Sequence, residues 1–350
     1  MMRFRRWSKD ADNTNNTDNN NFVDVTELND EIEPIIKDYY ISNILLFKEN
    51  FSNEKQAKEL VKEIKNLAVN IKVDEVKDLN VEIPMIIATD QEGGKVQRIL
   101  FNGPYKNNSE IKDPEEAYEK GRKIGEELSD LGINCNLAPV ADVSNLSSVI
   151  GARSFGDDPE YVAKCCTNFL KGLRECGILA TAKHFPGHGD TSTNPHSRLP
   201  VIEKSEEELQ NCELVPFKSL INENIDLIMT AHILLKKIDE DYPATLSSKI
   251  LTEMLRKKMG YTGVIITDSM GMGAITKNFS KFEACKLAIQ AGADILCIPE
   301  ILKRKKDVPE LENLYRYLES EIEKDSTFKK RVNESVERIL KLKNRLTRSL

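Results

Sequence analysis

The chain has 350 residues, of which 40% are hydrophobic and 31% are charged, and its formal net charge is −7. This length allows one large core or two ordinary ones, and the composition is that of a soluble globular protein. The negative net charge argues against nucleic acid as the main partner, because phosphate binding requires a basic face.

The cysteines and the apolar runs point to a cytoplasmic protein. The cysteine count of 7 is odd, and neither a Cys-x-x-Cys pair nor a zinc-ligand spacing occurs. We therefore expect free thiols in a reducing compartment and no metal or other cofactor. No apolar run approaches the roughly 20 residues that span a bilayer, so we expect no membrane span. A start clipped before Met1 would also have removed any targeting segment.

The first 22 residues differ in composition from the rest of the chain. Residues 1–7 resemble the remnant of a first strand, and residues 8 to about 22 are rich in Asn and Asp with almost no apolar side chain. Such a segment cannot bury enough apolar surface to fold, so we expect an exposed loop. The sequence thus predicts that residues 1–22 precede one domain formed by residues 23–350.

Beyond residue 25, amphipathic segments typical of helices alternate with short apolar segments typical of strands. In residues 53–69, for example, apolar side chains recur every three or four positions, as on one face of a helix. We predict strands at 41–47, 84–89, 133–138, 178–182, 226–230, 263–267 and 294–298, and helices at about 26–40, 53–69, 114–131, 158–176, 205–223, 247–259, 280–291, 308–323 and 327–346.

This alternation predicts an α/β fold with a parallel sheet. The predicted strands are apolar throughout, as expected of strands that are buried on both faces by covering helices. A further strand at residues 2–6 would complete eight strand–helix units, which predicts a single-domain (β/α)8 barrel of the TIM type. A doubly wound open sheet is the alternative, but no Gly-x-Gly-x-x-Gly turn follows any predicted strand.

Unusual polar side chains follow several of the predicted strands. In a (β/α)8 barrel the active site lies at the C-terminal ends of the strands, so side chains from different strands meet there. We expect one pocket to collect Asp90, Asp142, Lys183, His184, His232 and Asp268, together with Arg153 from the long loop after the fourth strand.

Residues 183–196 contain three of the four histidines, interspersed with glycine and proline. One interpretation is a glycosidase, which needs a carboxylate to attack the sugar and an acid to protonate the leaving oxygen. Asp268 would be the nucleophile. His196 would be the acid/base, because an imidazole has an ordinary pKa of about 6.5 and can both give and take a proton near neutral pH.

Two other chemistries remain open from the residues alone. A metal-dependent hydrolase would use His184, His188 and His196 with Asp190, although these histidines lie in one loop with Gly and Pro between them. They lack a His-x-His on a strand or a His-x-x-x-His on a helix, which would fix the metal geometry. The third interpretation is a barrel that binds a sugar or another ligand without catalysis.

Four motifs, taken together, identify a family. Their order and spacing resemble glycoside hydrolase family 3, of the β-N-acetylglucosaminidase (β-hexosaminidase) type, from about Val25 to Leu346. The motifs are Asp90–Arg98, Arg153–Gly156, Lys183–Gly189 with His196 seven residues further on, and Thr267–Met270.

The resemblance implies a retaining exo-glycosidase that releases terminal β-N-acetylglucosamine from small carbohydrates, typically peptidoglycan fragments, without a metal or other cofactor. It implies that Asp268 forms a covalent glycosyl-enzyme and that His196 acts as acid/base. The sugar-binding residues it implies are Asp90, Arg98, Arg153, Lys183 and His184. The alternatives are a phosphorylase of β-N-acetylglucosaminides or β-glucosides and a sugar-binding member of low activity.

One position departs from the pattern of the family. Asn194 stands where the family usually has Asp, two residues before His196. A neutral amide can orient an imidazole but stabilises the imidazolium less well than a carboxylate does, so we expect slower turnover or a shifted pH optimum. In the same loop as His196, we interpret His188 as a residue that shapes the loop and Asp190 as a loop cap. In the Asp90–Arg98 motif, we interpret Glu92 as a turn residue rather than a rival nucleophile.

Overall fold

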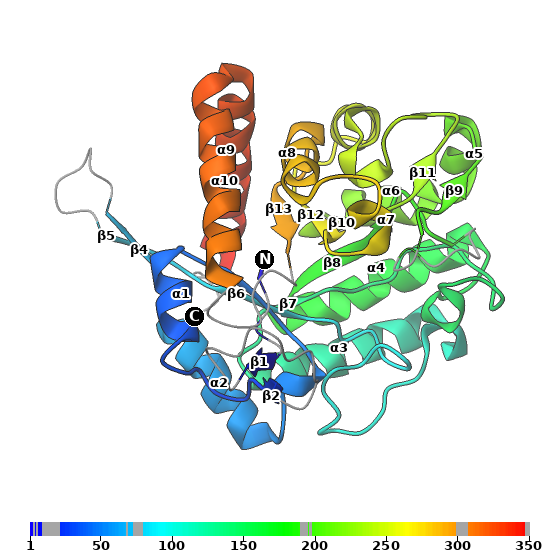
Figure 1. The fold of residues 1–350 in the computed structure, drawn as a ribbon. Helices are drawn as coiled ribbons and strands as arrows, with labels where there is room; N and C mark the ends of the chain where they lie inside the picture. The colour runs from blue at the N-terminus through cyan, green and yellow to red at the C-terminus, as the bar shows by residue number, and fades with distance from the viewer. Residues whose placement is uncertain are drawn as a thin grey trace.

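A computed structural model describes residues 1, 2, 4, 6–8, 22–67, 69–72, 80–189, 195, 198–298 and 307–346. Within these residues the central element is a curled parallel sheet of seven strands, which follow one another in space in their order along the chain (Figure 1). The strands are β3 (Asn43–Leu46), β6 (Ile86–Thr89), β7 (Cys135–Asn136), β8 (Leu179–Phe185), β10 (Leu227–Thr230), β12 (Val264–Ser269) and β13 (Ile295–Cys297).

Residues 1 and 2 connect the two edges of this sheet. Met2 forms a parallel bridge with Ile44 of β3, and its carbonyl accepts a hydrogen bond from the backbone N–H of Leu45. On the other side, the backbone nitrogen of Met1 donates to the carbonyl of Leu296, and its carbonyl accepts from Ile298. Both edge strands, β3 and β13, are therefore hydrogen-bonded to this short segment.

Helices cover the outer side of the sheet (Figure 1). Two of them, α3 and α4, begin with Asp at the N-cap followed by Pro, a favourable start because Pro has no N–H to satisfy in the first turn. The described helices are α1 (Ile32–Asp38), α2 (Glu54–Asn66), α3 (Pro114–Asp130), α4 (Pro159–Glu175), α5 (Glu206–Asn211), α6 (Leu214–Asn222), the π-helical η6 (Lys249–Lys258), α7 (Gly273–Thr276), α8 (Lys281–Ala291), α9 (Val308–Lys324) and α10 (Ser326–Leu346).

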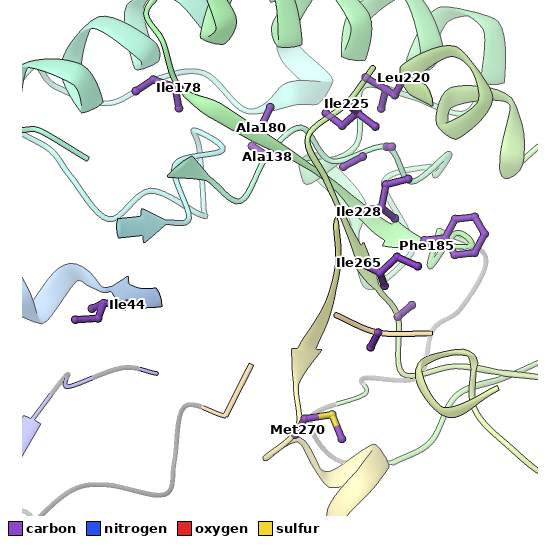
Figure 2. Close-up of a cluster of buried hydrophobic side chains, with 14 of the residues drawn as sticks. Ile44, Ala138, Ile178, Ala180, Phe185, Leu220, Ile225, Ile228, Ile265 and Met270 are labelled. Atoms are coloured by element: carbon purple, nitrogen blue, oxygen red, sulfur yellow. The ribbon is translucent and has the colours of Figure 1, made fainter. Parts of the chain in front are cut away.

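The buried side chains form two clusters, one on each face of the curled sheet. Successive side chains in a strand point to opposite faces, and the two clusters follow this period of two. Leu45, Met229 and Ile266 belong to the inner cluster, whereas their neighbours Ile228 and Ile265 belong to the outer one. Figure 2 shows part of the outer cluster, where Leu220 of α6 lies near Ile225, and Ile228 and Ile265 lie near Phe185.

Several predicted elements differ from the structure. The helix predicted at about 26–40 is limited to α1 (Ile32–Asp38), and the strand predicted at 133–138 is limited to β7 (Cys135–Asn136). Strand 178–182 is longer than predicted, because β8 continues to Phe185. The helix predicted at 205–223 is two helices, α5 and α6, and Pro216 lies in the first turn of α6, where its missing N–H costs nothing. The strand predicted at 2–6 is also wrong in extent.

The parallel pairing near the N-terminus occurs at Met2, whereas β1 (Arg6–Ser8) pairs antiparallel with β2 (Phe22–Asp24) outside the main sheet. Beyond Met2, the carbonyl of Phe4 is hydrogen-bonded to a side chain and not to a strand of the main sheet. The buried amide of Asn50 donates to the carbonyls of Phe4 and Val25 and holds the two segments together. Most of the loop predicted at residues 8–22 lies outside the described residues.

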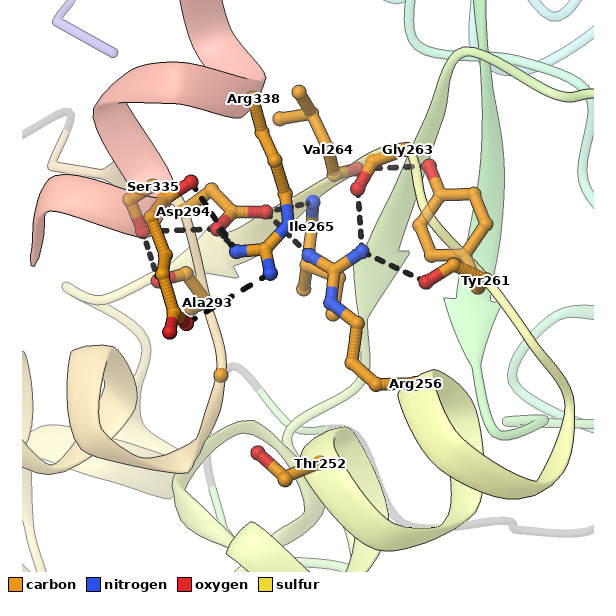
Figure 3. Close-up of polar contacts among 12 residues, drawn as sticks. Thr252, Arg256, Tyr261, Gly263, Val264, Ile265, Ala293, Asp294, Ser335 and Arg338 are labelled. Carbon is orange, nitrogen blue, oxygen red and sulfur yellow. Dashed lines mark hydrogen bonds and ion pairs between the residues drawn. The ribbon is translucent and has the colours of Figure 1, made fainter. Parts of the chain in front are cut away.

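The last helix, α10, is linked to the sheet through one buried carboxylate. Asp294, just before β13, accepts hydrogen bonds from Arg256 of η6 and from Arg331, Ser335 and Arg338 of α10. Figure 3 shows Arg256 on one side of Asp294 and Ser335 and Arg338 on the other. The C-terminal helix is thus held by charge as well as by apolar packing.

Two further features complete the description. The strands β4 (Val69–Lys72) and β5 (Asn80–Ile83) form an antiparallel hairpin that extends away from the body of the molecule (Figure 1). In the described part of the chain, no helix combines the length and the apolar character that crossing a membrane would require.

Candidate active site

A cavity of about 420 Å³ lies at the C-terminal ends of the sheet strands. Six of the residues that the sequence assigned to the site line this cavity, and they come from different strands and loops. They are Asp90, Arg98, Arg153, Lys183, His184 and Asp268. Asp90 directly follows β6, and Lys183, His184 and Asp268 lie within the last three residues of their strands, as expected where parallel strands converge.

Two carboxylates and three cations form a continuous network along one wall. The ammonium nitrogen of Lys183 lies 2.9 Å from Oδ1 of Asp90 and 2.6 Å from Oε1 of Glu92. Arg153 binds both oxygens of Glu92, through Nε at 2.9 Å and through its terminal nitrogen at 2.8 Å. Arg98 contacts the other oxygen of Asp90 at 3.2 Å. Each buried charge in the network therefore has an opposite charge beside it.

This network keeps its carboxylates ionised. Burial alone would raise the pKa of Asp90, but the charges of Lys183 and Arg98 outweigh burial and hold that pKa below its usual value. In the same way, Arg153 and Lys183 hold the pKa of Glu92 well below its ordinary range. Glu92 is only 1% exposed, and both of its oxygens are engaged, which suits a positioning carboxylate rather than a nucleophile.

A third carboxylate, that of Asp142, fixes the ring of His184. Its Oδ2 lies 2.7 Å from Nδ1 of His184, and the backbone N–H groups of His184 and His188 also donate to its carboxylate. Burial raises the pKa of Asp142, but the interactions with the two histidines are stronger in sum and lower it to about 2. Because an ionised carboxylate only accepts, the proton of His184 resides on Nδ1, and Nε2 is the nitrogen left for a ligand.

Asp268 is the penultimate residue of β12, and three strands of the sheet lie between β12 and β6, the strand that precedes Asp90. The Oδ1 atom of Asp268 accepts a hydrogen bond from the backbone N–H of Ser269 at 2.7 Å. Burial raises its pKa, but the neighbouring His232 and His184 and this hydrogen bond outweigh burial, so the pKa lies below its usual value. Asp268 is therefore a charged carboxylate at neutral pH.

His232 lies behind Asp268 rather than in the cavity wall. Its Nε2 donates to the carbonyl of Ser269 at 2.9 Å, because a carbonyl can only accept, and its Nδ1 lies 2.8 Å from the hydroxyl of Thr245. The side chain is almost wholly buried. His232 thus supports the backbone next to Asp268 and is not placed to contact a ligand directly.

The histidine-rich loop is described only in part. His196, Asn194 and Asp190 lie outside the described residues. Pro195 is described, lines the cavity and accepts a hydrogen bond through its carbonyl from the N–H of Ala274, at the start of α7. His188 is described as well, and it lines the cavity instead of merely shaping the loop.

Sequence reasoning did not assign a role to two further side chains of the site. Asp142 stood among the expected pocket residues without a function, and Phe47 was not named. The guanidinium of Arg98 lies over the ring of Phe47, 5.1 Å from its centre, so Phe47 helps to orient that cation. The position of Phe47, directly after strand β3, was the signal available in the sequence.

Comparison with known proteins identifies the family of this chain. The model of the glycosyl hydrolase family 3 N-terminal domain matches residues 17–342. The chain belongs to glycoside hydrolase family 3. This confirms the family that the four motifs predicted, and the curled parallel sheet agrees with the fold of its structural relatives.

Named relatives in the family are β-hexosaminidases. The chain is 32% identical over 347 residues to β-hexosaminidase A of Pseudoalteromonas piscicida, covering 93% of this chain and 57% of that protein. It is 30% identical over 321 residues to the β-hexosaminidase of Haemophilus influenzae, covering 87% of each. The chain thus spans little more than half of one relative and most of the other.

Solved structures give the same picture. A family 3 β-N-acetylglucosaminidase from Paenibacillus sp. str. FPU-7 superposes with a TM-score of 0.79 at 34% identity, covering 91% of this chain and 59% of that one. The β-N-acetylhexosaminidase of Beutenbergia cavernae also gives a TM-score of 0.79, at 25% identity, covering 92% of this chain and 95% of that one.

Proposed function

We propose that this family 3 member is a retaining exo-β-N-acetylglucosaminidase that acts on small carbohydrates. The observation that carries the proposal is that Asp268 and all five expected sugar-binding residues line one cavity. The names of the relatives support N-acetylglucosamine as the sugar. The five are Asp90, Arg98, Arg153, Lys183 and His184.

In the first step, a carboxylate oxygen of Asp268 attacks the anomeric carbon while the bond from that carbon to the leaving oxygen breaks. The imidazolium of His196 gives its proton to the leaving oxygen. In the second step, neutral His196 takes a proton from water, whose oxygen attacks the anomeric carbon and releases Asp268. The lowered pKa of Asp268 supports its part, because only the ionised carboxylate attacks. The role of His196 rests on the resemblance.

The other side chains would hold the sugar. The carboxylate of Asp90 can accept hydrogen bonds from sugar hydroxyls, and its contacts with Lys183 and Arg98 fix its direction. The Nε2 atom of His184 is available because Asp142 occupies Nδ1. Arg153, held by Glu92, would offer its remaining N–H groups to the substrate.

We further propose that residues 23–350, joined by Met1 and Met2, form the (β/α)8 catalytic domain. The hydrogen bonds of residues 1 and 2 to both β3 and β13 support a closed sheet. All seven cysteines are free, which supports a reducing, cytoplasmic environment. The proposed natural substrates are peptidoglycan fragments with a terminal N-acetylglucosamine.

One assay tests this function. The protein should hydrolyse an aryl N-acetyl-β-glucosaminide faster than an aryl β-glucoside, with no need for phosphate and no loss of rate with a chelator. Asp268→Asn should lower kcat by at least about a thousandfold, because the amide cannot form the ester. Asp226→Asn is the matched control, since Asp226 is buried and paired with Arg345 at the far end of β10. Equal loss in both variants would contradict the assignment.

A further inference from the structure

His188 lines the cavity, yet among the described residues its two ring nitrogens have no hydrogen-bond partner. The side chain is 3% exposed, and within the described chain neither Nδ1 nor Nε2 is hydrogen-bonded. A buried polar group without a partner costs free energy, so such groups are rare in native proteins. The ring of His184, its centre 6.0 Å away and edge-on, offers packing but no hydrogen bond.

The backbone holds His188 in a fixed place between two close contacts. A Cβ atom on Gly187 would lie 2.6 Å from Cβ of Glu213, and one on Gly189 would lie 1.8 Å from the carbonyl oxygen of Val143. The N–H of His188 itself donates to Asp142 at 2.6 Å. The glycines therefore shape this part of the loop, and they allow His188 to be mounted rigidly against the cavity.

The charge state of His188 fits a role in binding a neutral ligand. Burial has the largest effect and lowers the pKa of His188, and the neighbouring His184 lowers it too, against the opposing carboxylates of Asp142 and Asp268. The net pKa lies below its ordinary value, so the ring is neutral at neutral pH. A neutral imidazole carries one donor and one acceptor, and here both are unused.

We infer that His188 is a substrate-binding residue, whose ring nitrogens exchange hydrogen bonds with the sugar held in this cavity. The inference rests on the proposed function and adds a sixth sugar contact to it. One donor and one acceptor match a sugar hydroxyl, and they match equally the N–H and C=O of an acetamido group. The unpaired ring nitrogens of His188 are thus explained if they gain their hydrogen-bond partners when the sugar binds.

The variant His188→Phe separates binding from packing. Phenylalanine keeps an aromatic ring of similar size but has no polar atoms, so the ligand-free protein should melt roughly 2 °C higher. With an aryl N-acetyl-β-glucosaminide, kcat/KM should fall about 10- to 100-fold, because the sugar loses its hydrogen bonds. A purely structural histidine predicts the rise in melting temperature with kcat/KM within about twofold of wild type, and that result would overturn the inference.

Two conservative variants identify the nitrogen involved. The amide of Asn lies about where Nδ1 lies, and the amide of Gln reaches about as far as Nε2. His188→Asn or His188→Gln should therefore restore a large part of the kcat/KM lost in His188→Phe, and whichever restores more marks the nitrogen used. If His188→Phe loses kcat/KM only on the acetamido substrate, the contact is with the acetamido group. If it loses kcat/KM equally on an aryl β-glucoside, the contact is with a sugar hydroxyl. Failure of both amides to restore activity counts against the inference.

A binding measurement keeps this inference separate from the proposed activity. Free N-acetylglucosamine should raise the melting temperature of the wild type but have a weaker effect on His188→Phe. If the wild type shows this shift without turnover, the proposed hydrolysis fails while the His188 contact stands. If the wild type turns over and His188→Phe is equal to it in kinetics and in the melting shift, the activity stands and the His188 contact is wrong.

Discussion

Glu92 connects the two cations that are expected to hold the sugar. Its carboxylate binds Arg153 through both oxygens and Lys183 through one, and it is buried. A carboxylate in this position needs no contact with the substrate to affect binding, because it fixes where the donors of Arg153 and Lys183 point. Its place in the Asp90–Arg98 motif is thus explained by geometry rather than by attack on the sugar.

We expect Glu92→Gln to impair both stability and activity. Removing the charge leaves two buried cations with too little compensation, which should lower the free energy of unfolding by about 3 kcal/mol. It should also lower kcat/KM by about 10- to 100-fold, mainly through KM, because the cations lose their direction. Urea unfolding and steady-state kinetics check this. Asp226→Asn should lose stability with its kinetics unchanged, and an unchanged KM in Glu92→Gln would argue against the positioning role.

Asp142 makes stability depend on pH in the acid range. Its pKa in the folded protein is about 2, below its ordinary value of 3.8. A carboxylate with a depressed pKa stabilises the folded state fully above the ordinary pKa, and this contribution is lost as the pH falls from about 4 towards 2. The difference corresponds to about 2 kcal/mol.

We therefore expect Asp142→Asn to remove part of the acid sensitivity. Between pH 5 and about pH 3, the free energy of unfolding measured in urea should fall less steeply in the variant than in the wild type. At pH 7 the variant should be the less stable of the two, because the amide binds His184 more weakly. Parallel curves for the two proteins would show that the pKa of Asp142 is not depressed.

At the scale of elements, the loop that carries the expected acid/base has an unusual residue. Asn194 precedes His196 by two positions and lies, like His196, outside the described residues. The prediction for it rests on the sequence. A carboxylate would stabilise the imidazolium and raise the basicity of the histidine.

Asn194→Asp should therefore raise kcat on an aryl N-acetyl-β-glucosaminide, by about threefold to tenfold for a stronger acid/base partner. The pH profile of kcat should shift at the same time, because the pKa of His196 rises next to a carboxylate. Thr193→Asp adds the same charge one residue away and is the matched control. A rate in Asn194→Asp at or below that of the wild type would refute the idea.

The helices and strands that the sequence predicted well are those with a regular spacing of apolar residues, which also fixes which side chains are buried. The seven strands of the main sheet and helices such as α3 and α4 lie close to their predicted places, because the strands are apolar throughout and each of these helices buries one clear apolar face. The sequence did not predict the break between α5 and α6, where Pro216 begins a new helix inside a continuous amphipathic pattern. Nor did it predict that parallel pairing near the N-terminus occurs at Met2, or that the distant amide of Asn50 binds the carbonyl of Phe4.

The site shows the same division between local and long-range information. Motifs placed Asp90, Lys183 and Asp268 at strand ends, and the topology of the sheet brings strand ends together. The sequence could not show that Glu92 and Asp142 hold the other residues in place. These contacts span 61 residues from Glu92 to Arg153 and 42 from Asp142 to His184, and only the folded chain creates them.

At the scale of the whole molecule, Asp294 joins the C-terminal helix to the barrel strands. Arg256, Arg331 and Arg338 all lie within ion-pair distance of its buried carboxylate. Asp294→Asn would leave these partly buried cations without their shared counter-charge. It should lower the free energy of unfolding by about 3–5 kcal/mol.

The same variant should leave kcat/KM nearly unchanged, because Asp294 lies before β13, at the end of the sheet remote from the cavity. Asp130→Asn is the control, since its pair with Lys58 is exposed to solvent and should contribute little to stability. Urea unfolding of the three proteins at one pH makes the comparison. Equal stability of Asp294→Asn and Asp130→Asn would mean that the ion pairs of Asp294 do not stabilise the packing of α10.

The central claim is that Asp268 becomes covalently bonded to the sugar during turnover. The direct measurement is mass spectrometry of the peptide containing Asp268 after rapid acid quenching of the protein with an aryl N-acetyl-β-glucosaminide. We predict that this peptide gains the mass of one N-acetylglucosaminyl residue, attached at Asp268, and that the released sugar keeps the β configuration. An unmodified peptide together with a product of α configuration would contradict the account.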